Sequence, residues 1–131
     1  MDTSRGNPRL TLLGLLCVGF GLFGLLGALV DPVASSWVHL GSWGRLDPTV
    51  GDGGQFFLAL IGGIMAGWGA MMISLAGAWT PTTAPALRRA VLVGTGVWYV
   101  LDSGGSVLTG AWPNVFMNSA FLLTAIWASR R

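Results

Sequence analysis

Four long runs of apolar residues dominate the chain, and shorter stretches between them hold most of the charged and turn-forming residues. The runs cover approximately residues 10–30, 56–77, 86–110 and 114–128. A helix needs about 20 residues to cross the hydrocarbon region of a bilayer. The pattern therefore predicts four transmembrane helices, of which the last is the shortest. Its tight connection to the third, "GAWPN", makes these two helices an antiparallel hairpin.

Composition supports a membrane environment for these helices. Hydrophobic residues make up 53% of the chain and charged residues only 9%, with neither Lys nor Glu present. A soluble domain of this size needs many more charges to cover its surface, whereas lipid-facing helices need almost none. We therefore expect an all-α integral membrane protein, a single domain over residues 1–131 with four transmembrane helices in a bundle. Its arginines are too scattered for a nucleic-acid-binding stripe, so lipid is the first expected partner.

The arginines predict the orientation of the helices. Four spans place six of the seven arginines on one side: Arg5, Arg9, Arg88, Arg89, Arg130 and Arg131. The other side receives Arg45 together with Asp31, Asp47 and Asp52. Cytoplasmic flanks of membrane helices carry an excess of positive charge. The pattern thus predicts a multi-pass protein of a bacterial-type inner (plasma) membrane with both termini in the cytoplasm.

The first outer connection contains a short amphipathic segment, "VASSWVHLGSWGRL". Val33, Trp37 and Leu40 fall on one helical face of it. This spacing predicts a short interfacial helix, with Trp37 and Trp43 anchored at the depth of the lipid headgroups.

Small residues recur at steps of three and four along the first two helices. In lipid, such stripes let helix backbones approach closely. They are expected to pack helices within the bundle, against other membrane subunits, or in a homo-oligomer, and replacing Gly21 or Gly63 by Leu should weaken that packing. The packing positions are Gly14, Gly21, Gly24, Gly62, Gly63, Ala66 and Gly67.

The third helix carries a polar stripe at steps of four and three, formed by Thr95, Tyr99, Asp102, Ser106 and Thr109. An aspartate near the centre of a membrane helix costs at least about 2.5 kcal/mol, so Asp102 needs partners, a proton or a water-filled cavity. The fourth helix offers two amides. The depth of each predicts that Asn118 donates a hydrogen bond to Asp102 and that Asn114 lies near Thr109.

Two interpretations of this stripe remain open. It is either a polar clasp that fixes the register of the hairpin, or a path from the outer side that binds a proton, cation or polar ligand. The candidate ligand- or proton-binding residues are Tyr99, Asp102, Ser106, Asn114 and Asn118.

Other chemistries find little support in the sequence. His39 is the only histidine, the absence of lysine excludes a Schiff base, and Cys17 alone cannot form a dithiol pair within the chain. Asp47 and Asp52 lack the ligand pattern of a calcium loop. We therefore expect no metal, no cofactor and no enzymatic activity.

Two functions follow as expectations. The first is a small accessory or scaffolding protein that packs against other membrane helices, or against itself, through its Gly and Ala stripes. The alternative is a small homo-oligomeric transporter or channel in which the intramembrane Asp102 responds to protons or cations.

Overall fold

A computed structural model describes residues 6–47 and 51–130 and confirms the all-helical prediction, since those two ranges contain five helices and no strand. Three of the helices are long and apolar enough to cross a membrane over Pro8–Gly27, Gly53–Gly77 and Ala84–Leu108. The fifth helix is apolar but only 15 residues long. In chain order, the helices are α1 (Pro8–Gly27), α2 (Asp31–Ser42), α3 (Asp52–Gly77), α4 (Ala84–Leu108) and α5 (Asn114–Ala128).

Helix α1 begins where its cap places it. The Asn7 side chain accepts a hydrogen bond from the backbone N–H of Leu10 at 3.2 Å, and Pro8 occupies the first helical position, where its missing N–H costs nothing. The helix therefore starts two residues before the predicted 10–30 range. It also ends earlier, at Gly27, because residues 28–30 form the turn that leads into α2.

Helix α2 is the short helix that the first outer connection predicted, but one of its tryptophans is placed differently. Trp37 is half-buried against α1, with its ring centroid 4.9 Å from that of Phe20 and 5.6 Å from that of Phe23. Aromatic neighbours hold this side chain inside the protein instead of at the outer surface. Trp43, by contrast, is 57% exposed.

Helices α1 and α3 pack backbone to backbone through their glycines. A Cβ atom on Gly14 would lie 2.7 Å from the carbonyl oxygen of Gly69, and one on Gly21 would lie 2.6 Å from that of Gly62. Neither distance leaves room for a side chain. Gly24 also faces the backbone of Gly62, so glycine permits the approach along much of this interface.

Two predicted packing residues do not take part in this interface. Among the described residues, Gly63 and Gly67 have no neighbour within 4 Å of an added Cβ, so both positions are open there. Helix α3 carries two adjacent series of small residues, one with Gly62 and one with Gly63, and only one of the two faces can lie against α1. The series that contains Gly62, Ala66 and Gly69 makes the contact. The expectation that Gly63→Leu weakens packing within the chain is therefore wrong.

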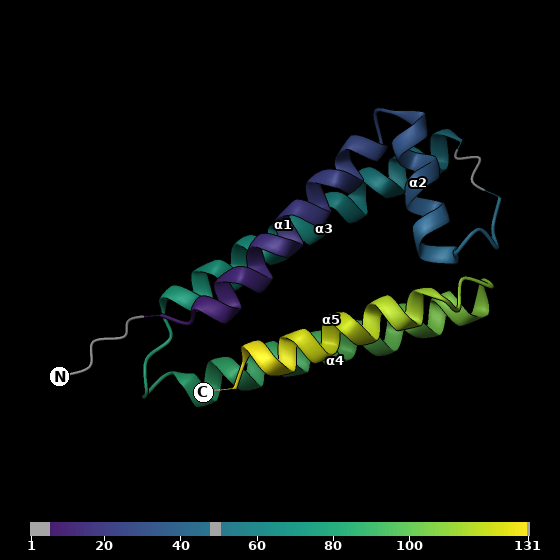
Figure 1. Ribbon diagram of the computed structural model, residues 1–131. Coiled ribbons are helices and arrows are strands. Elements are labelled where there is room, and N and C mark those ends of the chain that lie inside the picture. Colours follow the sequence, from purple (N-terminus) through teal and green to yellow (C-terminus); the bar gives the residue numbers. More distant parts are fainter. Residues whose placement is uncertain (1–5, 48–50, 131) are drawn as a thin grey trace.

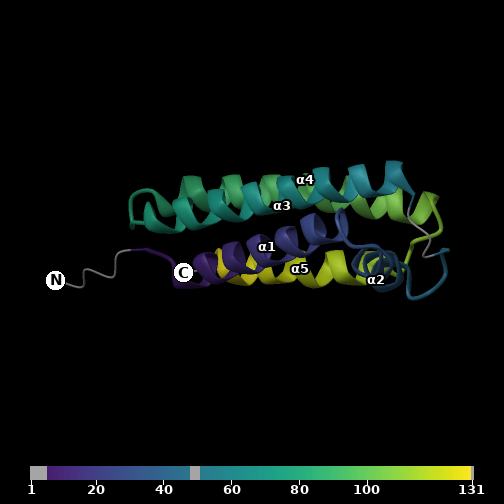
Figure 2. The ribbon, with the colours of Figure 1, turned by 90° about the horizontal axis from the view of Figure 1, so that it is seen from above.

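The chain forms two helical hairpins, α1 with α3 and α4 with α5, which approach each other most closely near the start of α1 and spread apart toward α2 (Figure 1). In the view from above, α1 overlaps α5, and α3 overlaps α4 (Figure 2). At the first end, Asn7 Nδ2 donates to the Ala128 carbonyl oxygen at 2.8 Å. At the other end, Trp43 stacks on Phe116 with ring centroids 5.5 Å apart. The buried core lies near the first end and includes Leu10, Leu13, Met72, Trp79, Val91 and Ala125.

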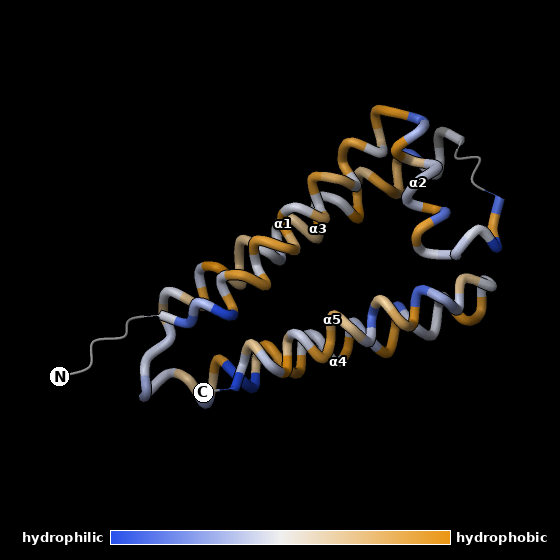
Figure 3. The backbone as a smooth tube through the Cα atoms, viewed as in Figure 1, coloured by the Kyte–Doolittle hydropathy of each residue, from blue (hydrophilic) through white to orange (hydrophobic). Residues whose placement is uncertain are grey.

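The ends of the long helices are hydrophilic (Figure 3), and the described charged residues lie there, except Asp102, which is within α4. Arg9, Arg88, Arg89 and Arg130 lie at the end where α1 begins and α5 finishes, whereas Asp31, Arg45 and Asp47 lie at the end near α2. Arg5, Arg131 and the side chain of Asp52 fall outside the described residues. Among the described residues, the first end therefore carries only arginines, whereas the second carries two aspartates and one arginine.

Candidate functional site

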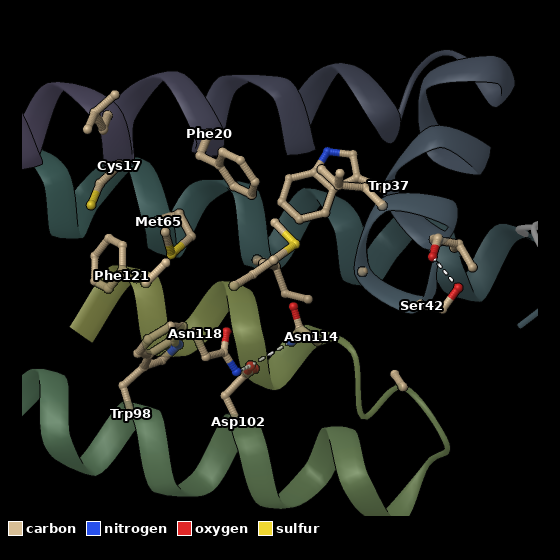
Figure 4. A pocket seen from close by; sticks show the side chains of 18 of the residues that line it. Cys17, Phe20, Trp37, Ser42, Met65, Trp98, Asp102, Asn114, Asn118 and Phe121 are labelled. Atoms are coloured by element: carbon tan, nitrogen blue, oxygen red, sulfur yellow. Dashed lines mark hydrogen bonds between the residues drawn. The ribbon is translucent and has the colours of Figure 1, made fainter. Parts of the chain in front are cut away.

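The candidate site is centred on Asp102, which lies on α4 and faces α5. Leu108, the last residue of α4, lies six positions further along the chain, a distance of about 9 Å along the axis. The predicted hydrogen bond is present, since Asn118 Nδ2 donates to Asp102 Oδ2 at 2.6 Å. Asn114 Nδ2 donates to the same oxygen at 3.0 Å (Figure 4). One carboxyl oxygen thus accepts both amides.

Each amide also binds a hydroxyl on α4. Asn118 Nδ2 donates to Ser103 Oγ at 3.1 Å, and Asn114 Nδ2 donates to Ser106 Oγ at 3.0 Å. Asp102, Ser103, Ser106, Asn114 and Asn118 together form what we call the carboxyl–amide network. Asn118 is only 4% exposed, and both serines are buried. The network therefore joins α4 to α5 in an apolar setting, where an unpaired polar group is costly.

The other predicted residues of the stripe lie outside this network. Asn114 contacts Ser106 and Asp102, so its predicted position near Thr109 was about one turn too close to the outer end. Thr109 is exposed and donates to the carbonyl oxygen of its own helix at Gly105, 2.9 Å away. Thr95 is fully buried, and its hydroxyl has no hydrogen-bond partner within the described residues.

Tyr99 pairs with a serine that sequence reasoning missed. Its hydroxyl lies 3.1 Å from Ser119 Oγ, one turn below the network. Ser103 was also missed, because it follows Asp102 directly and falls off the four-three spacing. Both serines are sequence neighbours of residues that were selected. Extending the predicted face of each helix by one position would have found them.

A cavity of about 500 Å³ adjoins the network, between the two hairpins and beside α2 (Figure 4). Residues of all five helices line it. Asp102 is the only charged residue among them, and Asp102 Oδ1 has no hydrogen bond within the described part of the chain. The carboxyl group therefore stands at the wall of an otherwise uncharged cavity with one oxygen unengaged.

Aromatic side chains from both hairpins line the cavity (Figure 4). On the side of Asp102, Trp98 and Phe121 meet edge to face with ring centroids 5.1 Å apart. Phe20 and Trp37 form a second edge-to-face pair, contributed by α1 and α2. These pairs give a hydrophobic ligand flat surfaces to contact.

Metal-ligating side chains do not gather here. Across residues 6–47 and 51–130, no three of His, Cys, Asp and Glu lie close enough together to hold a metal ion. Cys17 lines the cavity, whereas His39 lines a separate shallow pocket on α2. The arrangement can offer one carboxyl group and aromatic surfaces to an occupant.

Comparisons with protein-family models, with curated protein sequences and with solved structures found no significant match to this chain. The fold and the site alone therefore describe the class of protein. The described chain is all-helical, has three helices long and apolar enough to cross a membrane, and has a carboxyl–amide network at the wall of an apolar cavity.

Proposed function

We propose that the chain is an integral membrane protein in which α1, α3, α4 and α5 are the four spans. Support comes from the outward faces of these helices, which leave large apolar side chains uncovered. Leu101 on α4 is 70% exposed, and Leu123 on α5 is 66% exposed. Uncovered apolar side chains along every long helix are unfavourable in water and favourable in lipid. Helix α5 crosses as the partner of α4, despite its length.

The orientation follows from the segregated charges and can be measured. Reporter fusions at either terminus and at Thr82, between α3 and α4, are expected to report the cytoplasm, because arginines flank that end. A fusion at Gly51 should report the outer side. An outer C-terminus combined with an inner N-terminus would contradict the four-span proposal and would favour three spans.

We infer that Asp102 is a proton- or cation-binding group of a small membrane transporter or channel, which we expect to be a homo-oligomer. The observation that carries this proposal is the position of the carboxyl group, which lines the cavity while two amides donate to only one of its oxygens. A purely structural clasp would need no cavity beside it. Ionisable groups at membrane depth commonly mark ion and proton pathways.

Substitution of Asp102 by Asn is the test of this function. The purified full chain is reconstituted in liposomes that contain a pH-sensitive dye or a sodium indicator, and an ion gradient is imposed. The native chain should move protons or sodium, and Asp102→Asn should reduce the flux at least tenfold, because an amide cannot exchange a proton or carry the charge.

The matched control is Asp31→Asn, which removes an exposed carboxyl group at the start of α2. Its flux should equal that of the native chain. Circular dichroism establishes that each variant is folded. If the folded native chain carries no flux, or if Asp102→Asn carries as much as the native chain, the transport proposal fails.

A scaffolding role is the second candidate, and the open glycines favour it. Four glycines have no neighbour within 4 Å of an added Cβ in the described part of the chain, so other helices can approach them: Gly63 and Gly67 on α3, and Gly94 and Gly104 on α4. Under this role, Gly63→Leu should lose a membrane protein that co-purifies with the native chain in mild detergent. Co-purification that is unchanged by Gly63→Leu and Gly104→Leu would count against it.

A further inference from the structure

We propose that the cavity binds an organic monocation with a hydrophobic body, such as an aromatic or branched-alkyl ammonium ion. This inference rests on the proposed cation site at Asp102 and names the chemical class of its ligand. Three features of the cavity carry it: its single charge, its aromatic walls and its size.

The negative charge of Asp102 favours a positively charged ligand in the cavity. Among the described residues, Asp102 is the only charged residue of the lining, and no arginine or histidine side chain there lines the cavity with it. A carboxylate in an apolar environment is costly without a counter-charge. The two amides stabilise Oδ2 but bring no positive charge, and Oδ1 has no hydrogen bond among the described residues. An ammonium group beside Oδ1 would supply the missing charge.

The aromatic and methionine side chains of the lining favour a ligand with a hydrophobic body. Trp98 lies one helical turn from Asp102 on α4 and lines the same cavity, which places an indole ring on the side of the carboxyl group. A cation over an aromatic face gains about 0.5–2 kcal/mol. The opposite side of the cavity offers Phe20 and Trp37. Met65 and Met117, which also line the cavity, have flexible side chains that adapt to ligands of different shape.

The size and the donors of the site disfavour a divalent metal ion as its main ligand. The volume of about 500 Å³ falls within the range of small-molecule pockets, roughly 300–1,000 Å³. A hydrated metal ion would face mostly apolar walls. Asp102 is the only carboxylate among the described lining residues, whereas sites for divalent cations usually combine several carboxylate and carbonyl oxygens.

Equilibrium dialysis tests the ligand class directly. The full chain in lipid nanodiscs is dialysed against radiolabelled phenyltrimethylammonium, whose charge is permanent. We expect saturable binding by the native chain and at least tenfold weaker binding by Asp102→Asn. Asp31→Asn should bind as the native chain does. Excess tert-butylbenzene, the neutral probe of the same shape, should compete at least tenfold more weakly than unlabelled phenyltrimethylammonium.

A second variant covers the case in which Asp102→Asn does not fold. Ala120→Phe adds a ring at the cavity wall and leaves the carboxyl–amide network unchanged, so it too should weaken binding at least tenfold. The proposal is overturned if the folded native chain shows no saturable binding. Unchanged affinity for phenyltrimethylammonium in folded Asp102→Asn and folded Ala120→Phe overturns it as well. Equal competition by tert-butylbenzene also overturns it and indicates an apolar occupant such as an acyl chain.

Failure of the proposed ligand class can be distinguished from failure of the transport proposal. Proton or sodium flux that depends on Asp102, without binding of phenyltrimethylammonium, overturns the ligand class and leaves the transport proposal intact. Binding that depends on Asp102, without any flux, supports the ligand class and overturns transport.

Discussion

Replacement of Gly21 by Ala is expected to destabilise the protein more than any other single-methyl change in α1. The added Cβ would lie 2.6 Å from the carbonyl oxygen of Gly62 and 2.9 Å from the Cβ of Ala66. Backbone atoms cannot rotate away as a flexible side chain can, so α1 and α3 must separate. We expect a loss of about 3 kcal/mol, at the upper end of the range for overpacked cores. Reversible unfolding in mixed micelles, followed by circular dichroism, measures it.

Gly63→Ala is the matched control for this prediction. It makes the same chemical change in the middle of a helix, one position from Gly62, but an added Cβ there meets nothing within 4 Å. Alanine also favours the helix more than glycine does. We therefore expect unchanged or slightly higher stability of the monomer. Equal losses from Gly21→Ala and Gly63→Ala would refute the packing of α1 on α3 described above.

Replacement of Asn118 by Leu should also destabilise the protein, by removing the centre of the carboxyl–amide network. The variant loses two donated hydrogen bonds and leaves Asp102 with Asn114 as its single amide partner. Hydrogen bonds in membranes average about 0.6 kcal/mol, with the strongest near 1.7 kcal/mol, and bonds to charged groups are the stronger ones. We expect a loss of about 1–2 kcal/mol in the same unfolding measurement.

Thr124→Val is the control for the network. Thr124 is also on α5, but its hydroxyl donates only to the carbonyl oxygen of Ala120 in its own helix, at 2.8 Å. Its replacement should change stability by much less than Asn118→Leu. If both variants were as stable as the native chain, the network would contribute nothing to holding α4 against α5.

The positions of the helices could be predicted because each apolar run is long and is bounded by polar residues or proline. The predicted fourth helix, 114–128, coincides with α5, and the others differ by a few residues at their ends. Those differences have local causes. Asn7 caps α1 before its apolar run begins, and α3 extends back to Asp52 through glycines that carry no hydropathy signal.

The partnership between Asp102 and Asn118 was also predictable, because it depends on two simple facts. A membrane aspartate needs a partner, and a hairpin with a short turn brings residues at equal distances from the turn to the same depth. Counting from the turn in the same way placed Asn114 near Thr109, about one helical turn closer to the outer end than its observed position beside Ser106 and Asp102. Both amides converge on one carboxyl oxygen, and that convergence depends on how α4 and α5 rotate against each other.

The sequence by itself determined which segments are helical, which ends carry the arginines, and that Asp102 must find a partner across the α4–α5 hairpin. Only the tertiary structure decided that Gly62, and not Gly63, meets α1, that Trp37 points inward, and that a cavity opens beside Asp102. Helical periodicity establishes which residues share a face, but it leaves the rotation of each helix about its axis undetermined. That rotation, and the space between two hairpins, are set by contacts between residues far apart in the chain.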